Sequence, residues 1–314
     1  MRMRIPLLVA LALINWVGYT QAVQESARPF HTIAKVPTTP VKNQAATGTC
    51  WSFSTTSLVE TESPFKGKTI DISEMYTVRN IYVEKAKNYI LRQGVAQFGQ
   101  GGLGHDVIRS IDRYGALPES AYSGLMVSAG THDHTQLEIR LKTFLDSLLK
   151  HRPIPSNWMA EYSAILDSYL GKVPETFTYS EKVYTPESFA KEVLQFNAAN
   201  YVNITSFTHH PYYEAFILEV PDNFSNGAYY NIPLEEMMDL VDSALKGGYS
   251  VMWDADVSNP CFRQKEGIAL YSNVRDRSVP LDLQMKELPY DATVRQGLFE
   301  NLTTQDDHLM HLVG

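Results

Sequence analysis

The sequence lacks the features that would place it in several large classes of protein. It has only 2 cysteines among 314 residues, so a fold held together by a disulfide framework is excluded. Its net charge of -8 comes without a block of basic residues, which argues against nucleic acid as a main partner. It has no internal repeat and no low-complexity run. A hydrophobic content of 44% instead fits one large globular domain or two smaller ones.

The first 22 residues have the pattern of a signal peptide. Residues 1–4 are basic, residues 5–14 are apolar, and small residues precede a cleavage position after Ala22. The apolar run is too short for a comfortable membrane span, although a retained anchor is the alternative. We therefore expect export to the periplasm or the extracellular space, no stable membrane association, and a mature domain over residues 23–314.

The clearest sign of chemistry is Cys50, which follows a polar turn and precedes an amphipathic run. The pattern predicts a helix from Cys50 to about Glu62, with the thiol at its N-terminus, where free N–H groups and the helix dipole favour a thiolate. Gln44 carries a side-chain amide that can donate to an oxyanion near the sulfur. Two alternatives stay open: a buried structural cysteine, and a disulfide with Cys261 that would silence the nucleophile.

Residues 41–54 read VKNQAATGTCWSFS, with Gln44, Gly48, Cys50 and Trp51 at fixed spacing. This segment resembles the active-site segment of papain-like cysteine peptidases. Thr47 stands where many secreted members have a disulfide-forming cysteine, so the resemblance favours the bleomycin hydrolase and aminopeptidase C branch. It implies an α+β papain-like fold with two lobes, a helical one with the Cys50 helix and a β-rich one. It also implies thiol-dependent hydrolysis of peptide substrates, most closely that of an aminopeptidase.

The end of the chain resembles the strand that carries the catalytic histidine in this family. His308 follows two aspartates and precedes an apolar, β-like run that ends in Val-Gly. The resemblance implies that His308 takes the proton of the Cys50 thiol, while Gln44 and the Cys50 N–H hold the oxyanion. His311 is expected to face the opposite side of the strand from His308. Leu309 replaces the usual small residue and is expected to narrow the substrate pocket.

The asparagine that orients the catalytic histidine in this family lies downstream of it, and no asparagine follows His308 in this sequence. The resemblance therefore implies that C-terminal strands are missing, and we expect a truncated product or a fragment with an incomplete C-terminal lobe. Two alternatives to an active aminopeptidase stay open: an endopeptidase, and a catalytically impaired papain-like binding protein. Whether the chain forms a homo-oligomer also stays open.

A glycine-rich stretch at 99–104 satisfies the G-x-G-x-x-G pattern of dinucleotide sites. A short polar segment precedes it instead of a hydrophobic strand, so no nucleotide is predicted, and no other cofactor. A helix is expected to follow it and to end at Gly115. The resemblance implies that Gly101 and Gly102 line the substrate cleft, where glycine lets the backbone approach an extended peptide. It also assigns Trp51 to substrate binding.

Residues 123–248 are expected to form a large, helical insertion. Helices are predicted from a Ser73 or Asp71 cap to about 91, at 135–150, at 157–171, from Thr185 with Pro186 at its first position, and at 234–246, with a strand at 249–255. Two histidine pairs offer possible metal ligands: His132 with His134, and His209 with His210. No cysteine or third histidine lies at matching spacing, so no metal site is predicted.

Overall fold

The computed structural model describes residues 31–63, 69–126, 130–281 and 285–314. The chain divides into two units, and the fold described below is that of the second, Ile33–Gly314. The predicted signal peptide lies outside the described residues. None of the helices in the described ranges combines the length and the apolar character needed to cross a membrane.

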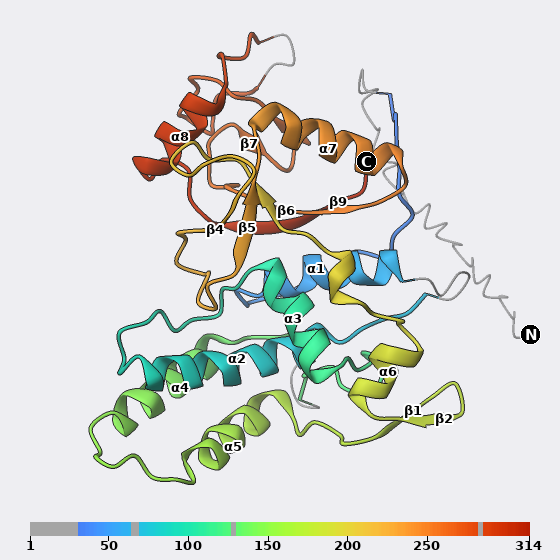
Figure 1. The fold of residues 1–314 in the computed structure, drawn as a ribbon, viewed down its shortest axis with the longest axis vertical. Helices are drawn as coiled ribbons and strands as arrows, with labels where there is room; N and C mark the ends of the chain where they lie inside the picture. The colour runs from blue at the N-terminus through green and yellow to red at the C-terminus, as the bar shows by residue number, and fades with distance from the viewer. Residues whose placement is uncertain (1–30, 64–68, 127–129, 282–284) are drawn as a thin grey trace, which may run out of the picture. The chain divides into compact units, whose positions relative to one another are not determined.

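Three helices pack on one another in the first part of the second unit: α1 (Cys50–Glu62), α2 (Glu74–Leu91) and α3 (Gly104–Tyr114) (Figure 1). Local signals set their ends as predicted. The Ser73 hydroxyl accepts a hydrogen bond from the Tyr76 N–H and caps α2. Gly115 ends α3 with a φ of 77°, which glycine adopts without strain.

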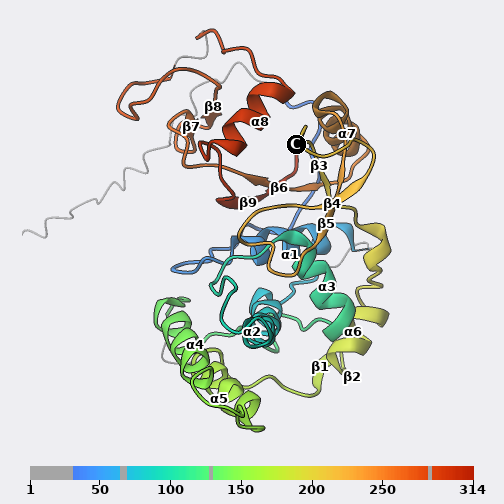
Figure 2. The same cartoon turned by 60° about the vertical axis from the view of Figure 1, so that its left-hand side comes forward.

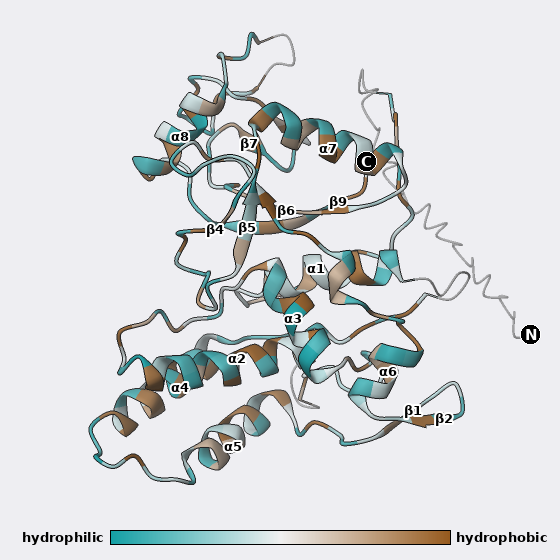
Figure 3. Cartoon of the chain, in the orientation of Figure 1, coloured by the Kyte–Doolittle hydropathy of each residue, from teal (hydrophilic) through white to brown (hydrophobic). Residues whose placement is uncertain are grey.

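Helices α4 (Thr135–Leu148) and α5 (Trp158–Leu170) pack together and against α2. Figure 3 shows hydrophobic and hydrophilic residues interleaved along both helices, as expected for amphipathic helices. Their buried positions recur every three or four residues: Leu137, Leu141, Leu145 and Leu148 on α4, and Tyr162, Leu166 and Leu170 on α5. Both helices confirm the predicted elements within two residues of the predicted ends.

The middle of the chain holds more strand than expected. It contains α6 (Pro186–Glu192) and the short helix η1 (Ala198–Asn200), but also the hairpin β1 (Phe177–Tyr179) and β2 (Lys182–Tyr184). A three-stranded sheet follows, in the order β3 (Ile204–Thr205), β5 (Ala228–Asn231) and β4 (Ala215–Ile217). The predicted helix with Pro186 at its first position is confirmed as α6, but the strands of this region were not predicted, because strands of two to four residues are too short to show a two-residue period.

The last part contains α7 (Leu234–Lys246), β6 (Val251–Ala255), β7 (Phe262–Arg263), β8 (Ile268–Ala269), α8 (Ala292–Glu300) and β9 (His308–Leu312). Strands β6 and β9 form an antiparallel pair. In its register Ala255 is opposite His308 and Met252 is opposite His311. Because successive side chains of a strand alternate between its faces, this register confirms that the two histidines lie on opposite faces of β9.

Helix α1 contacts α2 and α3 on one side and the β6–β9 pair on the other (Figures 1 and 2). Its N-terminal residue, Cys50, therefore lies where helical and strand segments meet. This arrangement places the beginning of α1 and the beginning of β9 at one site, as a two-lobed α+β fold requires.

A buried cluster of charges joins the beginning of α2 to α1. The Lys42 ammonium lies 3.3 Å from a carboxylate oxygen of Glu60 and 2.6 Å from one of Glu74. The two glutamate side chains are only 1% and 4% exposed. Burial raises the pKa of Glu74 to about 7, although the Lys42 charge lowers it. Glu60 also accepts hydrogen bonds from the Thr39 hydroxyl at 2.6 Å and from the Ile72 N–H at 2.7 Å.

Candidate active site

Cys50 is the first residue of α1, as predicted, and its side chain is half-buried. Cys261 is buried elsewhere, with its sulfur 3.1 Å from the Ser272 hydroxyl. Both are free thiols, so the alternative of a disulfide between them is wrong. The predicted position of the thiol, at the N-terminus of a helix, is therefore confirmed.

The acidity of the Cys50 thiol departs from the prediction. Burial raises the pKa of the thiol. The backbone N–H groups of Leu309 and Trp51, which lie near the sulfur, lower this pKa. The carboxyl groups of Asp254 and Asp306 raise it again. The net shift is upward, so in this structure the surroundings favour the thiol over the thiolate. The helix N-terminus alone predicted the opposite direction, because that argument did not include burial or the two aspartates.

His308 begins β9 and directly precedes Leu309, whose backbone lies near the Cys50 sulfur. Its side chain is half-buried, and its ring takes part in none of the hydrogen bonds or ion pairs found in the described ranges. The structure therefore brings the strand that carries His308 to Cys50, and the direct pairing of the two side chains stays a prediction.

His311 is not an alternative partner for Cys50. Its Nδ1 atom lies 2.9 Å from the hydroxyl of Ser57 on α1. Ser57 follows Cys50 by two helical turns, or about 10 Å along the axis. Burial lowers the pKa of His311 to about 4, so the ring is neutral at physiological pH.

Gln44 is held in the turn that precedes α1. Its side-chain nitrogen donates to the backbone carbonyl of Thr47 at 2.6 Å, and the Thr47 hydroxyl donates to the Gln44 carbonyl at 2.8 Å. The amide nitrogen carries two hydrogens, so one donor remains for a substrate oxygen. The role of Gln44 in holding an oxyanion stays a prediction.

The Trp51 ring packs directly against the backbone of Gly102. A Cβ on Gly102 would come within 3.0 Å of the Trp51 indole ring, so only glycine fits against it without movement. Trp51 itself is 1% exposed. The buried ring supports the glycine segment, and the assignment of Trp51 to substrate binding stays a prediction.

Gln100 attaches the glycine segment to the beginning of α1. Its carbonyl accepts a hydrogen bond from the Trp51 indole N–H at 2.9 Å, and its side-chain oxygen accepts one from the Gly48 N–H at 2.7 Å. Next to it, a side chain on Gly101 would collide with the carboxyl group of Asp222. The two predicted cleft residues therefore lie beside the turn that carries Cys50, and their contact with substrate stays a prediction.

Three carboxyl groups that the sequence did not single out gather around this site: Asp222, Asp254 and Asp306. Burial and the charge of Asp306 raise the pKa of Asp254, and burial and the charge of Asp222 raise that of Asp306. The buried ammonium of Lys85 lies close to Asp222 and lowers its pKa, but burial outweighs this and the net shift is upward. Lys85 also donates to the carbonyls of Gly99, at 2.9 Å, and Gly101.

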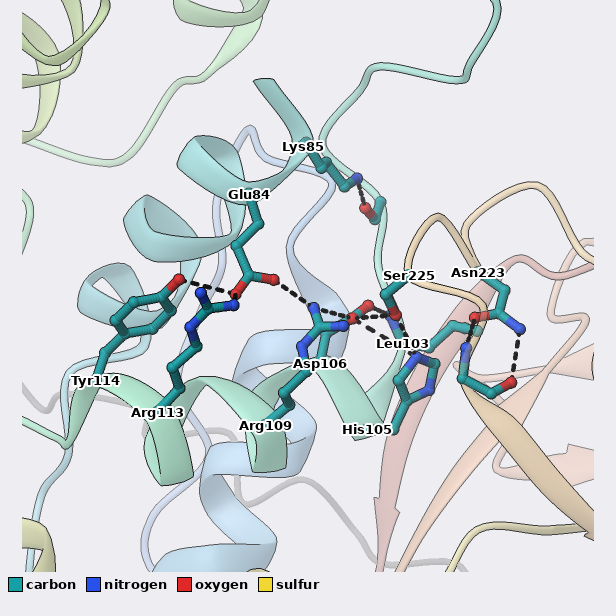
Figure 4. A network of polar contacts seen from close by, with 12 residues as sticks. Glu84, Lys85, Leu103, His105, Asp106, Arg109, Arg113, Tyr114, Asn223 and Ser225 are labelled. Carbon is teal, nitrogen blue, oxygen red and sulfur yellow. Dashed lines mark hydrogen bonds and ion pairs between the residues drawn. The ribbon is translucent and has the colours of Figure 1, made fainter. Parts of the chain in front are cut away.

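A polar network fixes the loop that carries Asp222 onto α3 (Figure 4). One carboxylate oxygen of Asp106 accepts from the Arg109 guanidinium and from the Ser225 hydroxyl, both at 2.8 Å, and the other accepts from the Leu103 N–H at 3.1 Å. Arg109 in turn donates to Glu84 of α2 at 2.6 Å. The network therefore links α2, the N-terminus of α3 and the aspartate loop in one rigid frame.

Comparisons with known proteins cover most of the chain. A model of the papain family of cysteine proteases matches residues 29–122, and a model described as the Peptidase C1-like family matches residues 99–288. Aminopeptidase C of Streptococcus thermophilus is 25% identical over 319 residues, which span 87% of this chain and 70% of that protein. Aminopeptidase W of Lactobacillus delbrueckii subsp. lactis is 24% identical over 339 residues, 95% of this chain and 75% of that protein.

One solved structure supports the fold. The crystal structure of PepW from Lactobacillus rhamnosis HN001 superimposes with a TM-score of 0.66 at 20% identity, over 90% of this chain and 71% of that one. At this level of identity the likeness concerns the fold alone. It confirms the predicted α+β fold class.

Proposed function

The chain belongs to the Peptidase C1-like family, and on that premise we propose that it hydrolyses peptide bonds through Cys50, as an aminopeptidase. The observation that carries the proposal is the position of the Cys50 thiol, at the first residue of α1 and against the beginning of β9. The similarity to aminopeptidases C and W supports the choice of an amino-terminal substrate.

In the proposed reaction His308 takes the proton of the Cys50 thiol, and the thiolate attacks the carbonyl carbon of the first peptide bond. The resulting oxyanion accepts hydrogen bonds from the Cys50 N–H, which has no partner within the helix, and from the remaining hydrogen of the Gln44 amide. His308 then gives its proton to the leaving amine. Water hydrolyses the thioester, which releases the amino acid and restores the thiol.

The aspartates beside the sulfur favour cleavage at an amino terminus over internal cleavage. In a peptide with a free amino terminus, only the α-carbon separates the ammonium group from the carbonyl carbon that Cys50 attacks. Asp254 and Asp306 lie near enough to the sulfur to change its pKa. The Oδ1 atom of Asp254 is buried and has no hydrogen-bond partner among the described residues. That oxygen is available as an acceptor for the substrate ammonium.

Paired substrates test the proposal. A fluorogenic aminoacyl amide with a free amino group and the same compound N-acetylated are compared for turnover by the wild type, Cys50→Ala and Cys261→Ala. We expect turnover of the free compound only, its loss in Cys50→Ala, and its retention in Cys261→Ala, because Cys261 is buried apart from the site. Equal cleavage of the acetylated compound would establish an endopeptidase instead.

An epoxide that alkylates papain-type thiols separates an inactive binding protein from an enzyme with a different substrate. Labelling of the wild type beyond that of Cys50→Ala shows an activated thiol even if the chosen amides are not cleaved. Equal labelling of the two proteins, together with no turnover, would favour the catalytically impaired binding protein.

Export of the chain is proposed on the pattern of residues 1–22. N-terminal sequencing of the protein recovered from fractionated cells tests it. We expect the exported fraction to begin after Ala22. Recovery of the protein only from the cytoplasm with Met1 at its terminus would contradict export, and recovery from membranes with residues 1–22 attached would favour the retained anchor.

A further inference from the structure

Two histidines and a glutamate converge next to the three-stranded sheet, on elements other than those of the Cys50 site. His209 and His210 lie in the connection from β3 to β4, and Glu219 follows β4. The Nε2 atom of His209 is 3.2 Å from one oxygen of Glu219, and that of His210 is 2.7 Å from the other. Within the ranges that the structure describes, this is the single group of three or more His, Cys, Asp or Glu residues found with ligand atoms within 4.8 Å of one another.

Buried Asn231 of β5 fixes the backbone that carries the two histidines. Its amide nitrogen donates to the carbonyls of Phe207 at 2.8 Å, His210 at 3.0 Å and Pro211 at 3.1 Å. Its oxygen accepts from the Phe207 N–H at 2.9 Å. The connection is therefore held from inside the sheet, and little backbone freedom remains to be lost when a ligand binds.

Aromatic side chains hold the two imidazole rings. The ring of His210 stacks on Phe216 with centroids 4.1 Å apart and planes 22° apart. The ring of His209 lies nearly parallel to Phe299 of α8, with centroids 5.9 Å and planes 24° apart. The ligand atoms remain open to solvent, because the side chains of His209, His210 and Glu219 are 27%, 32% and 53% exposed. An ion can therefore enter a site whose rings are already oriented.

A side chain of α8 also orders the ring of His209 from the protein side. The side-chain nitrogen of Gln296 donates to the Nδ1 atom of His209 at 2.9 Å, and the Gln296 oxygen accepts from the Thr208 N–H at 2.7 Å. In this arrangement the His209 proton is on Nε2 and is donated to Glu219. A metal ion that binds at Nε2 displaces this proton, so binding should weaken as the pH falls.

We propose that His209, His210 and Glu219 bind one zinc ion, with a fourth position open to water. Two imidazoles and a carboxylate are a common ligand set for zinc. With bonds of about 2.0–2.1 Å, tetrahedral zinc places its ligand atoms about 3.3 Å apart. The His–Glu distances of 3.2 and 2.7 Å therefore need only small changes. The sequence-based expectation of no metal rested on a missing third ligand, and the structure supplies a carboxylate in that place.

Isothermal titration of zinc chloride into the metal-free full chain tests the site. All proteins carry Cys50→Ala, so that zinc binding to the active-site thiol does not contribute. We expect one ion per chain with a dissociation constant in the micromolar range, and at least tenfold weaker binding in Glu219→Gln and in His210→Ala. His151→Ala is the matched control, since His151 is exposed and its ring contacts only the Ser147 carbonyl; its binding should be unchanged.

Two further measurements separate a ligand role from a structural one. Glu219→Gln keeps the size of the side chain, so its melting temperature without zinc should match that of the parent, while the rise on adding zinc should be lost. Magnesium and calcium, which prefer oxygen ligands, should not bind. Absence of saturable zinc binding, or binding of equal strength in Glu219→Gln, His210→Ala and the parent, would overturn the proposal. Neither result depends on peptidase activity.

Discussion

The backbone N–H of Leu309 lies beside the Cys50 sulfur, which brings the first residue of α1 to the second residue of β9. The environment of the thiol is therefore built by segments from opposite ends of the sequence. Two N–H groups draw its pKa down while burial and two aspartates drive it up, and the second set prevails. Activation of the thiol must then come from a partner that takes its proton, which is the role proposed for His308.

His308→Gln should lower kcat for a free aminoacyl amide by about 10²- to 10⁴-fold, because the thiol loses its proton acceptor. His311→Gln is the matched control on the same strand, where the ring contacts Ser57 instead of the Cys50 region. It should retain kcat within a few-fold. Steady-state kinetics of both variants make the comparison. If His311→Gln were the inactive variant and His308→Gln the active one, the assignment of the base would be wrong.

Asp254→Asn should lower the pKa of the Cys50 thiol, because a negative charge that opposes the thiolate is removed. The rate of alkylation by iodoacetamide, measured against pH, reports this pKa. Asp239→Asn on the exposed surface of α7 should leave the profile unchanged. An upward shift in Asp254→Asn would contradict the structure around the sulfur.

Asp254 should also make stability depend on pH. Burial and the charge of Asp306 raise its pKa in the folded chain above the unfolded value of about 3.9, so the folded state holds more protons between the two values. The free energy of unfolding should therefore fall as pH rises from about 4 through the folded pKa. Urea denaturation at pH 5 and pH 8 should show a smaller fall in Asp254→Asn than in Asp239→Asn. Equal falls would rule out this linkage.

Lys42→Met should destabilise the fold by about 3–5 kcal/mol, because it leaves the buried carboxylates of Glu60 and Glu74 without their cation. Urea denaturation measures the loss. Lys246→Met is the control, since Lys246 and its partner Asp242 are more than half exposed, and such surface pairs contribute little. A decrease of less than about 1 kcal/mol in the free energy of unfolding of Lys42→Met would show that Glu60 and Glu74 do not depend on the Lys42 charge.

Gly102→Ala should cost about 1–3 kcal/mol and reduce kcat/KM, because the methyl group must displace the Trp51 ring beneath the cleft segment. Gly297→Ala on α8 is the opposite case. No atom lies within 4 Å of the methyl group that it adds, and alanine favours a helix interior, so it should be neutral or slightly stabilising. Thermal unfolding should show a lower melting temperature for Gly102→Ala and an unchanged or higher one for Gly297→Ala. Steady-state kinetics should show a lower kcat/KM for Gly102→Ala alone.

The sequence predicted best what local chemistry decides. The Ser73 cap, the left-handed Gly115 and the Thr185 cap each define a helix end through neighbours a few residues away, and the structure confirms all three. Strands of two to four residues, such as β3, carry no readable period and were missed.

The aspartates around Cys50 were missed for a different reason. Asp222, Asp254 and Asp306 come from three separate segments, and no sequence pattern relates them. The one local sign was the acidic pair directly before His308. The same long-range contacts reversed the predicted shift of the Cys50 pKa, since a helix N-terminus is a local feature and burial by β9 is not.

The two hydrogen bonds of Gln100 make this residue a spacer of fixed length between the glycine segment and the turn before α1. The segment that is predicted to line the substrate cleft is thereby fixed to the turn that carries the nucleophile. A substrate of unusual bulk cannot be accommodated by moving that segment without displacing the thiol. Variation that broadens the choice of substrate should therefore be concentrated away from the glycine segment, around Leu309 beside the sulfur.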